Sequence, residues 1–370
     1  MKPRYEVADV LQLKHDQIDQ LAGNSWQART LYALAACRTP LMGGHIDRCT
    51  NPDCHALHLS YNSCRNRHCP KCQGHKREEW IRAREAELLN TTYYHIVFTL
   101  PDAFNQMALH QPALLYKQLF KVAWSVIQSF AANHQFLGAK TGMIAILHTW
   151  GQNLILHPHL HCIVPGGGVT PSHKWRIAKK KNKYLFPVKA MSKVFRARML
   201  AAIRQHVPLK QTTAKALIQK KWVVYCKQPF WGSAQVIEYL GRYTHKIAIS
   251  NHRIKAIADN TITFTAKDYR KGGQKHLITL SHQEFIRRFA LHILPKAFVR
   301  IRHYGILASA IKQKTRVLVE KQIGKASIIQ HPPIRHRLCH KCGTGQLVTI
   351  LTFDCRGPPP LALLPYLTPN

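Results

Sequence analysis

Three histidines stand at alternate positions in the segment LILHPHLHCIVPGGG, which covers residues 154–168. They are His157, His159 and His161, and the residues around them are otherwise mostly apolar. Side chains two residues apart in a β-strand point to the same face, so His159 and His161 would lie side by side, ~7 Å apart at their Cα atoms. A single histidine in such a segment is more often a packing residue. Two on one face, next to a glycine turn, indicate a divalent metal site.

Carboxylates, the other common metal ligands, are scarce around this segment. Residues 88–258 contain only Asp102 and Glu238. This excludes a core of three carboxylates, of the kind that holds Mg²⁺ in many DNA-cutting enzymes. The metal would be held by neutral imidazoles, and the third ligand stays open. Gln152, seven residues before His159, is the first candidate, Glu238 is the second and His157 is the third.

A nucleophile is available in the segment EYLGRYTHK, which places Tyr239 and Tyr243 four residues apart on one face of an expected helix. Two tyrosines packed on a core are the alternative. Tyrosine attacks a phosphodiester only as phenolate, and its pKa in water is ~10. The cations Arg242 and Lys246, together with a metal ion, would favour the phenolate.

Close-spaced cysteines predict a structural zinc site near the N-terminus. Zinc in such sites takes four thiolate or imidazole ligands in a tetrahedron, and the best ligand set here is Cys49, Cys54, Cys69 and Cys72. Further cysteines and histidines leave room for an additional zinc ion, namely Cys37, His45, Cys64 and His68. Cations surround this cluster and suggest a DNA-docking surface, formed by Arg65, Arg67 and Lys71.

A second cysteine knuckle, Cys339 and Cys342, lies near the C-terminus with Cys355. It has no clear fourth ligand, although His336 or His340 could serve, and an unliganded reduced pair is the alternative. Tight spacing beside histidines favours reduced thiols that bind metal over disulfides.

The charge balance points to a polyanionic partner. The 370 residues include 54 Lys and Arg against 17 Asp and Glu, a formal charge of +37. This imbalance is far beyond what solubility needs, so nucleic acid is the expected partner. No apolar run approaches the ~20 residues of a membrane span, and the start of the chain does not read as a signal peptide. We therefore expect a cytosolic protein that is not associated with a membrane.

The order of expected elements indicates an α+β fold built on an antiparallel sheet. Strands are expected over residues 92–100, 142–150 and 153–167, and a hairpin over residues 261–281. Helices are expected over residues 25–39, 74–90, 112–134, 192–206, 233–248 and 282–294.

Several motifs resemble those of one protein family. HPHLH resembles the HUH motif of single-strand DNA endonucleases, and HIVFTLP resembles their first strand motif. Together with YNSCRNRHCPKCQ, YLGRYTHKIAISN and EFIRRFALHILPKAFVRIRHYG, they resemble the insertion sequence 91 family of rolling-circle transposases, over residues 25 to about 310. One detail departs from the family pattern, since four residues separate Cys49 and Cys54 where the family often has two.

The resemblance implies a HUH domain with a ferredoxin-like antiparallel sheet and helices, an N-terminal zinc-binding domain and two catalytic tyrosines. His159 and His161 match the motif histidines, and Tyr239 and Tyr243 match the tyrosine pair. Such enzymes cut one DNA strand, leave a 5′-phosphotyrosine link and a free 3′-OH, and move their element as single-stranded DNA. The implied cofactors are structural Zn²⁺ and catalytic Mg²⁺ or Mn²⁺.

This assignment predicts four parts of the chain. They are a helical and zinc-binding DNA-binding domain (1–90), a two-tyrosine HUH nuclease domain (91–250), an α/β extension (251–325) and a tail with a possible second cysteine knuckle (326–370). The expected partner is DNA, mainly the single-stranded ends of its own element and a target strand; nothing indicates a protein partner. Two alternatives stay open, an inactive zinc-dependent DNA-binding protein and a plasmid relaxase or replication initiator.

Overall fold

The computed structural model describes residues 3–73, 81–85, 87–179, 185–208, 211–230, 247–268, 272–326 and 337–358. Helices and antiparallel sheets alternate along these residues, which confirms the α+β class. Among the described residues, no helix is long and apolar enough to cross a lipid bilayer.

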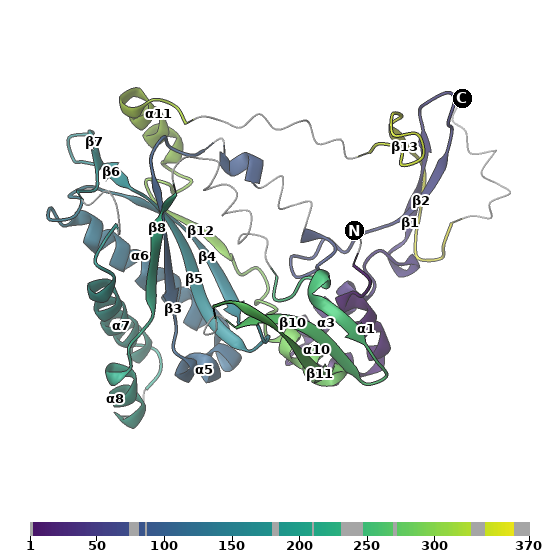
Figure 1. Ribbon diagram of the computed structural model, residues 1–370, viewed down its shortest axis with the longest axis horizontal. Coiled ribbons are helices and arrows are strands. Elements are labelled where there is room, and N and C mark those ends of the chain that lie inside the picture. Colours follow the sequence, from purple (N-terminus) through teal and green to yellow (C-terminus); the bar gives the residue numbers. More distant parts are fainter. Residues whose placement is uncertain are drawn as a thin grey trace.

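The largest sheet has five antiparallel strands in the order β12–β4–β5–β3–β8 (Figure 1). The expected strands are confirmed, and β8 and β12 complete the sheet from later parts of the chain. The bounds are β3 (Tyr93–Thr99), β4 (Gly142–Trp150), β5 (Leu156–Pro165), β8 (Val224–Phe230) and β12 (Ile301–Gly305).

Helices cover one face of this sheet. The long helix α6 (Pro112–Ala132) and α7 (Val188–Arg204) lie along it, with the shorter α5 (Asn105–His110) and α8 (Gln211–Gln219) beside them (Figure 1). Alternate residues of β3 and β5 point into this layer, so that Phe98 and Leu160 are fully buried in the main hydrophobic core. The helices expected over residues 112–134 and 192–206 are thus confirmed, with ends shifted by a few residues.

The opposite face of the sheet is apolar at one end and carries histidines at the other. At one end Tyr93, Ile144 and Ile163 form a small apolar core with residues of α11 (Lys312–Ile323). The short ribbon β6 (Gly167–Val169) and β7 (Trp175–Ile177) also lies at this end. At the other end this face carries histidines. Successive side chains of a strand point to opposite faces of the sheet, so the leucines of β5 point toward the helices and its histidines point to the opposite face.

A second sheet, β9–β10–β11, shares its core with the N-terminal helices. Phe264 of β10 and Phe285 of α10 pack in one buried cluster with Leu31 and Leu34 of α3. The predicted division between residues 1–90 and 251–325 therefore differs from the structure, in which these two parts bury one another. The bounds are α1 (Val7–Leu13), α2 (Ile18–Leu21), α3 (Ser25–Ala35), β9 (Ile254–Ile257), β10 (Thr261–Asp268), β11 (Gln274–Ser281) and α10 (His282–Ala290).

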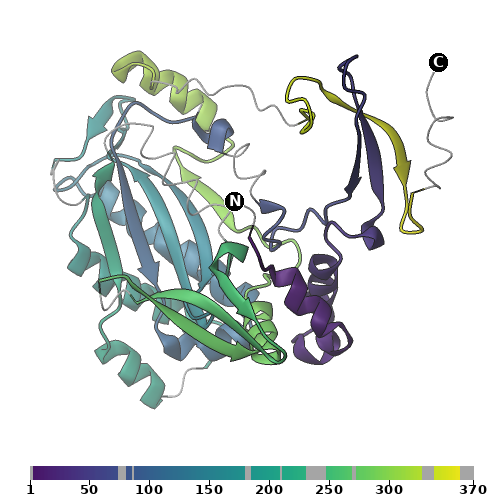
Figure 2. The ribbon, with the colours of Figure 1, turned by 45° about the vertical axis from the view of Figure 1, so that its right-hand side comes forward.

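The third sheet joins the two ends of the chain. Its order is β13–β1–β2, formed by β1 (Gly44–Cys49), β2 (Leu57–Tyr61) and β13 (Leu347–Phe353). It lies apart from the five-stranded sheet in both views (Figures 1 and 2). The C-terminal segment that the sequence set aside as a tail is therefore part of the N-terminal cysteine module, and this corrects the predicted boundary at residue 326.

Candidate active site and cysteine clusters

Three imidazoles meet on the open face of the five-stranded sheet. His159 and His161 belong to β5, and His148 belongs to β4, directly opposite His159 in the strand register. One ring nitrogen from each residue lies within 4.8 Å of those of the other two. The ring centroids of His148 and His161 are 4.6 Å apart, and those of His159 and His161 are 4.9 Å apart. This donor set fits a divalent transition metal ion.

Neighbouring groups orient two of the three rings. His159 Nδ1 donates a hydrogen bond to the carbonyl oxygen of His157 at 2.6 Å, so its Nε2 has a lone pair to offer a metal. His161 Nδ1 lies 2.8 Å from Nε2 of His95, a buried histidine of β3. Metal-binding histidines commonly have such a partner on their second nitrogen, which fixes the tautomer and the ring orientation.

The sequence did not single out His148 as a ligand. It stands in the strand expected over residues 142–150, and the short turn to the next strand already implied that the two strands pair in antiparallel fashion. The sequence did not give the register of this pairing, which places His148 opposite His159. Gln152 and His157 line the same cleft, and His157 is not part of the three-histidine cluster. Burial lowers the pKa of His157, which favours the neutral ring. Glu238 lies outside the described residues.

The histidines open into a cleft of about 840 Å³. One wall is the end of the five-stranded sheet, including Trp150 and Tyr225, and the other is the hairpin β10–β11, which contributes Lys267, Asp268 and His276. Figure 2 shows this hairpin crossing in front of the sheet. The hairpin thus contributes a carboxylate and a cation to the lining of the cleft that the histidines also line.

Side chains from the second sheet region and from α10 and the residues after it hold the turn between β4 and β5 by hydrogen bonds to its carbonyl oxygens. Arg253 donates to the carbonyl oxygen of Gln152 at 2.5 Å, and Arg288 donates to that of Asn153 at 3.1 Å. His292 Nε2 donates to the carbonyl oxygen of Leu154 at 3.0 Å. Leu154 adopts a positive φ of 61° and is fully buried. These contacts hold the start of the histidine strand against a packed core.

The tyrosine pair and its neighbours cannot be placed. Tyr239, Tyr243, Arg242 and Lys246 all lie outside the described residues. Tyr225 of β8, a tyrosine the sequence did not single out, lines the histidine cleft with an exposed fraction of 53 %.

Four cysteines near the N-terminus form a buried cluster. Cys37 Sγ lies 3.5 Å from Cys72 Sγ and 3.6 Å from Cys69 Sγ, and Cys64 Sγ lies 3.7 Å from Cys72 Sγ. Tetrahedral zinc with Zn–S bonds of ~2.3 Å places its sulfur ligands ~3.8 Å apart. All eleven cysteines are among the described residues, and none of them forms a disulfide. The spacing fits one structural zinc ion.

The predicted grouping of Cys49 and Cys54 with Cys69 and Cys72 is wrong. The structure places the first pair in a separate cluster with Cys339 and Cys342. Cys37 and Cys64, expected to serve an additional ion, take their places beside Cys69 and Cys72. Spacing alone favoured the nearest pairs. The chain instead folds so that Cys37 joins the first cluster from before β1, and the second cluster combines cysteines from the two ends of the chain.

The two histidines suggested for an additional zinc ion belong to neither described cluster. His68 is buried and accepts a hydrogen bond from the backbone N–H of Leu294 at 3.3 Å. Burial holds its pKa well below the usual value, so it is neutral. His45 lies in β1, 3.5 Å from the carboxylate of Asp47.

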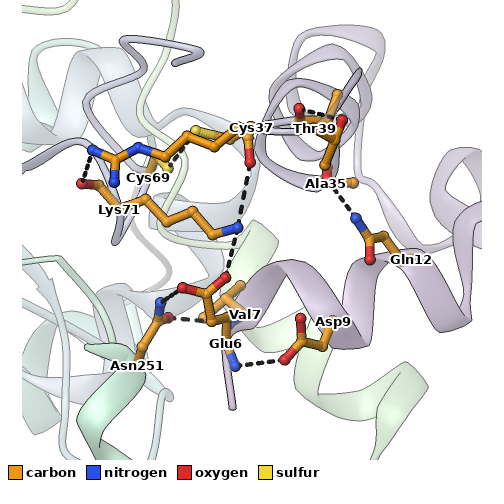
Figure 3. Close-up of polar contacts among 12 residues, drawn as sticks. Glu6, Val7, Asp9, Gln12, Ala35, Cys37, Thr39, Cys69, Lys71 and Asn251 are labelled. Carbon is orange, nitrogen blue, oxygen red and sulfur yellow. Dashed lines mark hydrogen bonds and ion pairs between the residues drawn. The ribbon is translucent and has the colours of Figure 1, made fainter. Parts of the chain in front are cut away.

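Two of the three cations expected to dock DNA have internal partners. Arg67 donates to the carbonyl oxygens of Pro295 and Phe298 and so attaches the cysteine loop to the core. Lys71 pairs with Glu6 at 2.5 Å and also donates to the carbonyl oxygen of Cys37, as Figure 3 shows. The side chain of Arg65 is exposed.

Comparisons with known proteins agree with both parts of this site. The family described as "Putative transposase" matches residues 142–315, which include the three-histidine cluster. The family described as "Transposase zinc-binding domain", of the insertion sequence 91 type, matches residues 10–100. The fold and site thus define a transposase with a zinc-binding domain.

Two individual relatives show to which family of transposases the chain belongs. The chain is 40% identical over 367 residues to "Putative transposase y4qJ" of Sinorhizobium fredii, covering 90% of this chain and 91% of that protein. It is 28% identical over 306 residues to the transposase for insertion sequence element IS801 of Pseudomonas savastanoi pv. phaseolicola, covering 77% of this chain and 71% of that protein. No solved structure matches it. The chain belongs to the insertion sequence 91 family of transposases.

Proposed function

We propose that the protein cuts and rejoins single-stranded DNA at the ends of its own element through a 5′-phosphotyrosine intermediate, in rolling-circle transposition. The observation that carries this proposal is the three-histidine cluster in an open cleft, in a chain of transposase ancestry. The few carboxylates of residues 88–258 support it, because they leave imidazoles to hold the catalytic cation. The protein would act where bacterial DNA lies, at the nucleoid.

His148, His159 and His161 would hold Mg²⁺ or Mn²⁺, with Gln152 as the first of the candidates from the sequence. A cation bound there would supply Lewis-acid polarisation of the scissile phosphate. His95 and the carbonyl of His157 orient the imidazoles. The nucleophiles in this proposal are Tyr239 and Tyr243.

In the cut, a tyrosine oxygen bonds to phosphorus as the bond from phosphorus to the 3′ oxygen breaks. The phenol proton passes to water, and the departing oxygen takes a proton, which yields a 5′-phosphotyrosine and a 3′-OH. Rejoining reverses these bonds when a 3′-OH attacks the phosphotyrosine. Two tyrosines allow one to hold a DNA end while the other cuts a second site.

The test uses labelled single-stranded oligonucleotides from the element ends, with Mn²⁺ or Mg²⁺, on a denaturing gel. We expect a covalent protein–DNA band that is retained in at least one of Tyr239→Phe and Tyr243→Phe and lost in the double variant. Tyr225→Phe is the matched control, because this exposed tyrosine lines the same cleft. An adduct that survives in the double variant but disappears in Tyr225→Phe would move the nucleophile to β8.

The same assay separates the alternatives. An inactive DNA-binding protein would shift the oligonucleotide on a native gel and give no covalent band. A relaxase or replication initiator would prefer a plasmid origin over the element ends.

A further inference from the structure

Four cysteines from opposite ends of the chain meet beside the third sheet. Cys49 ends β1 and Cys54 follows in the next turn, whereas Cys339 and Cys342 precede β13. Their sulfur atoms all lie within 4.8 Å of one another. The matched zinc-binding family ends at residue 100 and therefore does not include the second pair.

The distances fit a metal ion and not a disulfide. Cys49 Sγ lies 3.6 Å from Cys342 Sγ, and Cys54 Sγ lies 3.8 Å from Cys339 Sγ. A tetrahedral zinc ion gives ~3.8 Å between thiolates, while a disulfide needs ~2.05 Å. Both contacts pair a sulfur from the start of the chain with one from its end.

The backbone around the cluster accommodates and stabilises the sulfurs. The N–H of Asn51 donates to Cys49 Sγ at 3.4 Å, and the N–H of Gly345 donates to Cys342 Sγ at 3.3 Å. A Cβ atom at Gly345 would lie 2.3 Å from Cys49 Sγ, so only glycine fits there. His58 Nε2 lies 3.2 Å from Cys339 Sγ and can donate to the thiolate.

The third sheet has little else to hold it together. Ile46 is buried between its strands but belongs to none of the hydrophobic clusters found among the described residues, whereas Leu57, Leu59 and Val348 are about half exposed. A three-stranded sheet without a core of its own needs a disulfide or a metal to be stable. Polar contacts add to it, since Asp47 accepts hydrogen bonds from Thr349 at 2.7 Å and Arg337 at 3.1 Å.

We propose that a second zinc ion binds Cys49, Cys54, Cys339 and Cys342 and fastens the last strand of the chain onto the first. The sheet β13–β1–β2 then forms only when both ends of the chain are present. The first cluster, by contrast, is complete within residues 37–72.

The test measures zinc per chain in the purified full-length protein by mass spectrometry, together with hydrogen exchange of the amides of residues 347–353. We expect two zinc ions in the wild type and one in Cys339→Ser or Cys342→Ser, with exchange in β13 faster by at least tenfold. Cys355→Ser is the matched control, an exposed thiol of the same segment outside the cluster, and should keep both ions. Cys37→Ser should lose the other ion and leave β13 protected.

Cobalt substitution of the wild type makes the test independent of how the variants fold. Two sites of four thiolates each should give two equivalents of tetrahedral cobalt with sulfur charge-transfer bands. One tightly bound equivalent per chain, or unchanged zinc in both Cys339→Ser and Cys342→Ser, would overturn the proposal. The measurement requires no DNA cleavage, so its outcome does not depend on the proposed transposase mechanism.

Discussion

At the scale of single residues, the ability of the three histidines to bind a metal ion depends on which ring nitrogen of each imidazole carries the free lone pair. The hydrogen bond from His159 Nδ1 to a carbonyl oxygen allows one neutral tautomer, with the lone pair on Nε2. His161 Nδ1 lies 2.8 Å from Nε2 of His95, and either ring can donate in this contact. One ring nitrogen of His159 and one of His161 lie within 4.8 Å of a ring nitrogen of His148, which stands on the adjacent strand.

His148→Ala should abolish DNA cleavage and leave most of the DNA binding intact. Loss of an outer-shell partner of a metal ligand typically costs 10–100-fold in activity, so loss of a ligand should cost at least ~100-fold. Cleavage rates and native-gel affinities measure the two effects separately. His159→Ala and His161→Ala should behave alike.

One control variant and one test variant check whether His148 is the third ligand of the metal ion. His303 stands in β12 opposite Ile144, outside the three-histidine cluster, and His303→Ala should cleave at nearly the wild-type rate. Gln152→Ala tests the ligand predicted from the sequence. If it loses cleavage while His148→Ala retains it, the assignment of His148 is wrong.

His292 should make the protein less stable in acid. It is fully buried, and burial lowers its pKa from 6.5 to about 4. Between these values the unfolded chain binds a proton that the folded protein does not, so the free energy of unfolding falls as the pH drops from 6.5 to 4. The full effect is about 3 kcal/mol at 1.36 kcal/mol per pKa unit.

Chemical denaturation at pH 7 and pH 4.5 checks this. His292→Gln keeps a donor for the carbonyl of Leu154 but cannot titrate, so its stability should depend less on pH than that of the wild type. Equal pH dependence in both proteins would show that His292 is protonated in the fold.

At the scale of elements, the three glycines that follow the histidine strand have a packing role. Residues 166–168 lead from β5 into β6, where Val169 and Lys140 exchange backbone hydrogen bonds at 2.9 Å. A Cβ at Gly168 would lie 2.6 Å from the carbonyl oxygen of Lys140, and one at Gly167 would lie 2.4 Å from the ring of Trp175. The chain is thus packed against neighbouring backbone at the end opposite the metal site.

Gly168→Ala should destabilise the fold by ~1–3 kcal/mol, since the added methyl meets backbone that cannot move aside. Urea denaturation measures the change. Gly151→Ala, in the turn at the other end of β5, is the control. Its Cβ would meet the side-chain oxygen of Asn153 at 3.0 Å and backbone no closer than 3.7 Å, so the loss should be smaller. A larger loss at Gly151 would contradict this explanation.

The elements also show how far a sequence can predict a site. Alternation along residues 154–168 was enough to place His159 and His161 on one strand face, because that period is local. His148 was missed because its position opposite His159 depends on the pairing register of two strands, with an irregularity between His148 and Trp150. The cysteine clusters were divided incorrectly for a related reason. Cys49 and Cys342 are 293 residues apart, and short-range spacing carries no information about that contact.

At the scale of the whole molecule, the parts distinguished by sequence are bound together. The N-terminal helices share a core with α10 and the second sheet, and Trp26 donates to the carbonyl oxygen of Leu294 at 3.0 Å. Asn251 binds both Glu6 and the backbone N–H of Val7 (Figure 3). The N-terminal helices are therefore joined to the second sheet and α10 by a shared core and by side-chain hydrogen bonds.

The molecule keeps a large positive charge even after its internal ion pairs are counted. Several described carboxylates already bind cations of the protein, as Glu284 does with Arg287 and Arg288, and Asp102 with Lys220. With 17 acidic residues against 54 basic ones, such pairs cannot offset the excess of +37. The remaining charge needs a polyanion.

DNA binding should therefore weaken steeply with salt. Each phosphate neutralised on a single strand adds ~0.7 to the slope of log affinity against log salt, so six contacts predict at least ~100-fold weaker binding between ~50 and ~200 mM salt. Fluorescence anisotropy with a single-stranded element end measures this slope. Arg65→Ala should lower it by about one contact, whereas Lys71→Ala should change it little because Lys71 pairs with Glu6. A nearly flat salt dependence would mean that the excess charge does not serve to hold DNA, and equal effects of the two substitutions would contradict the different roles assigned to Arg65 and Lys71.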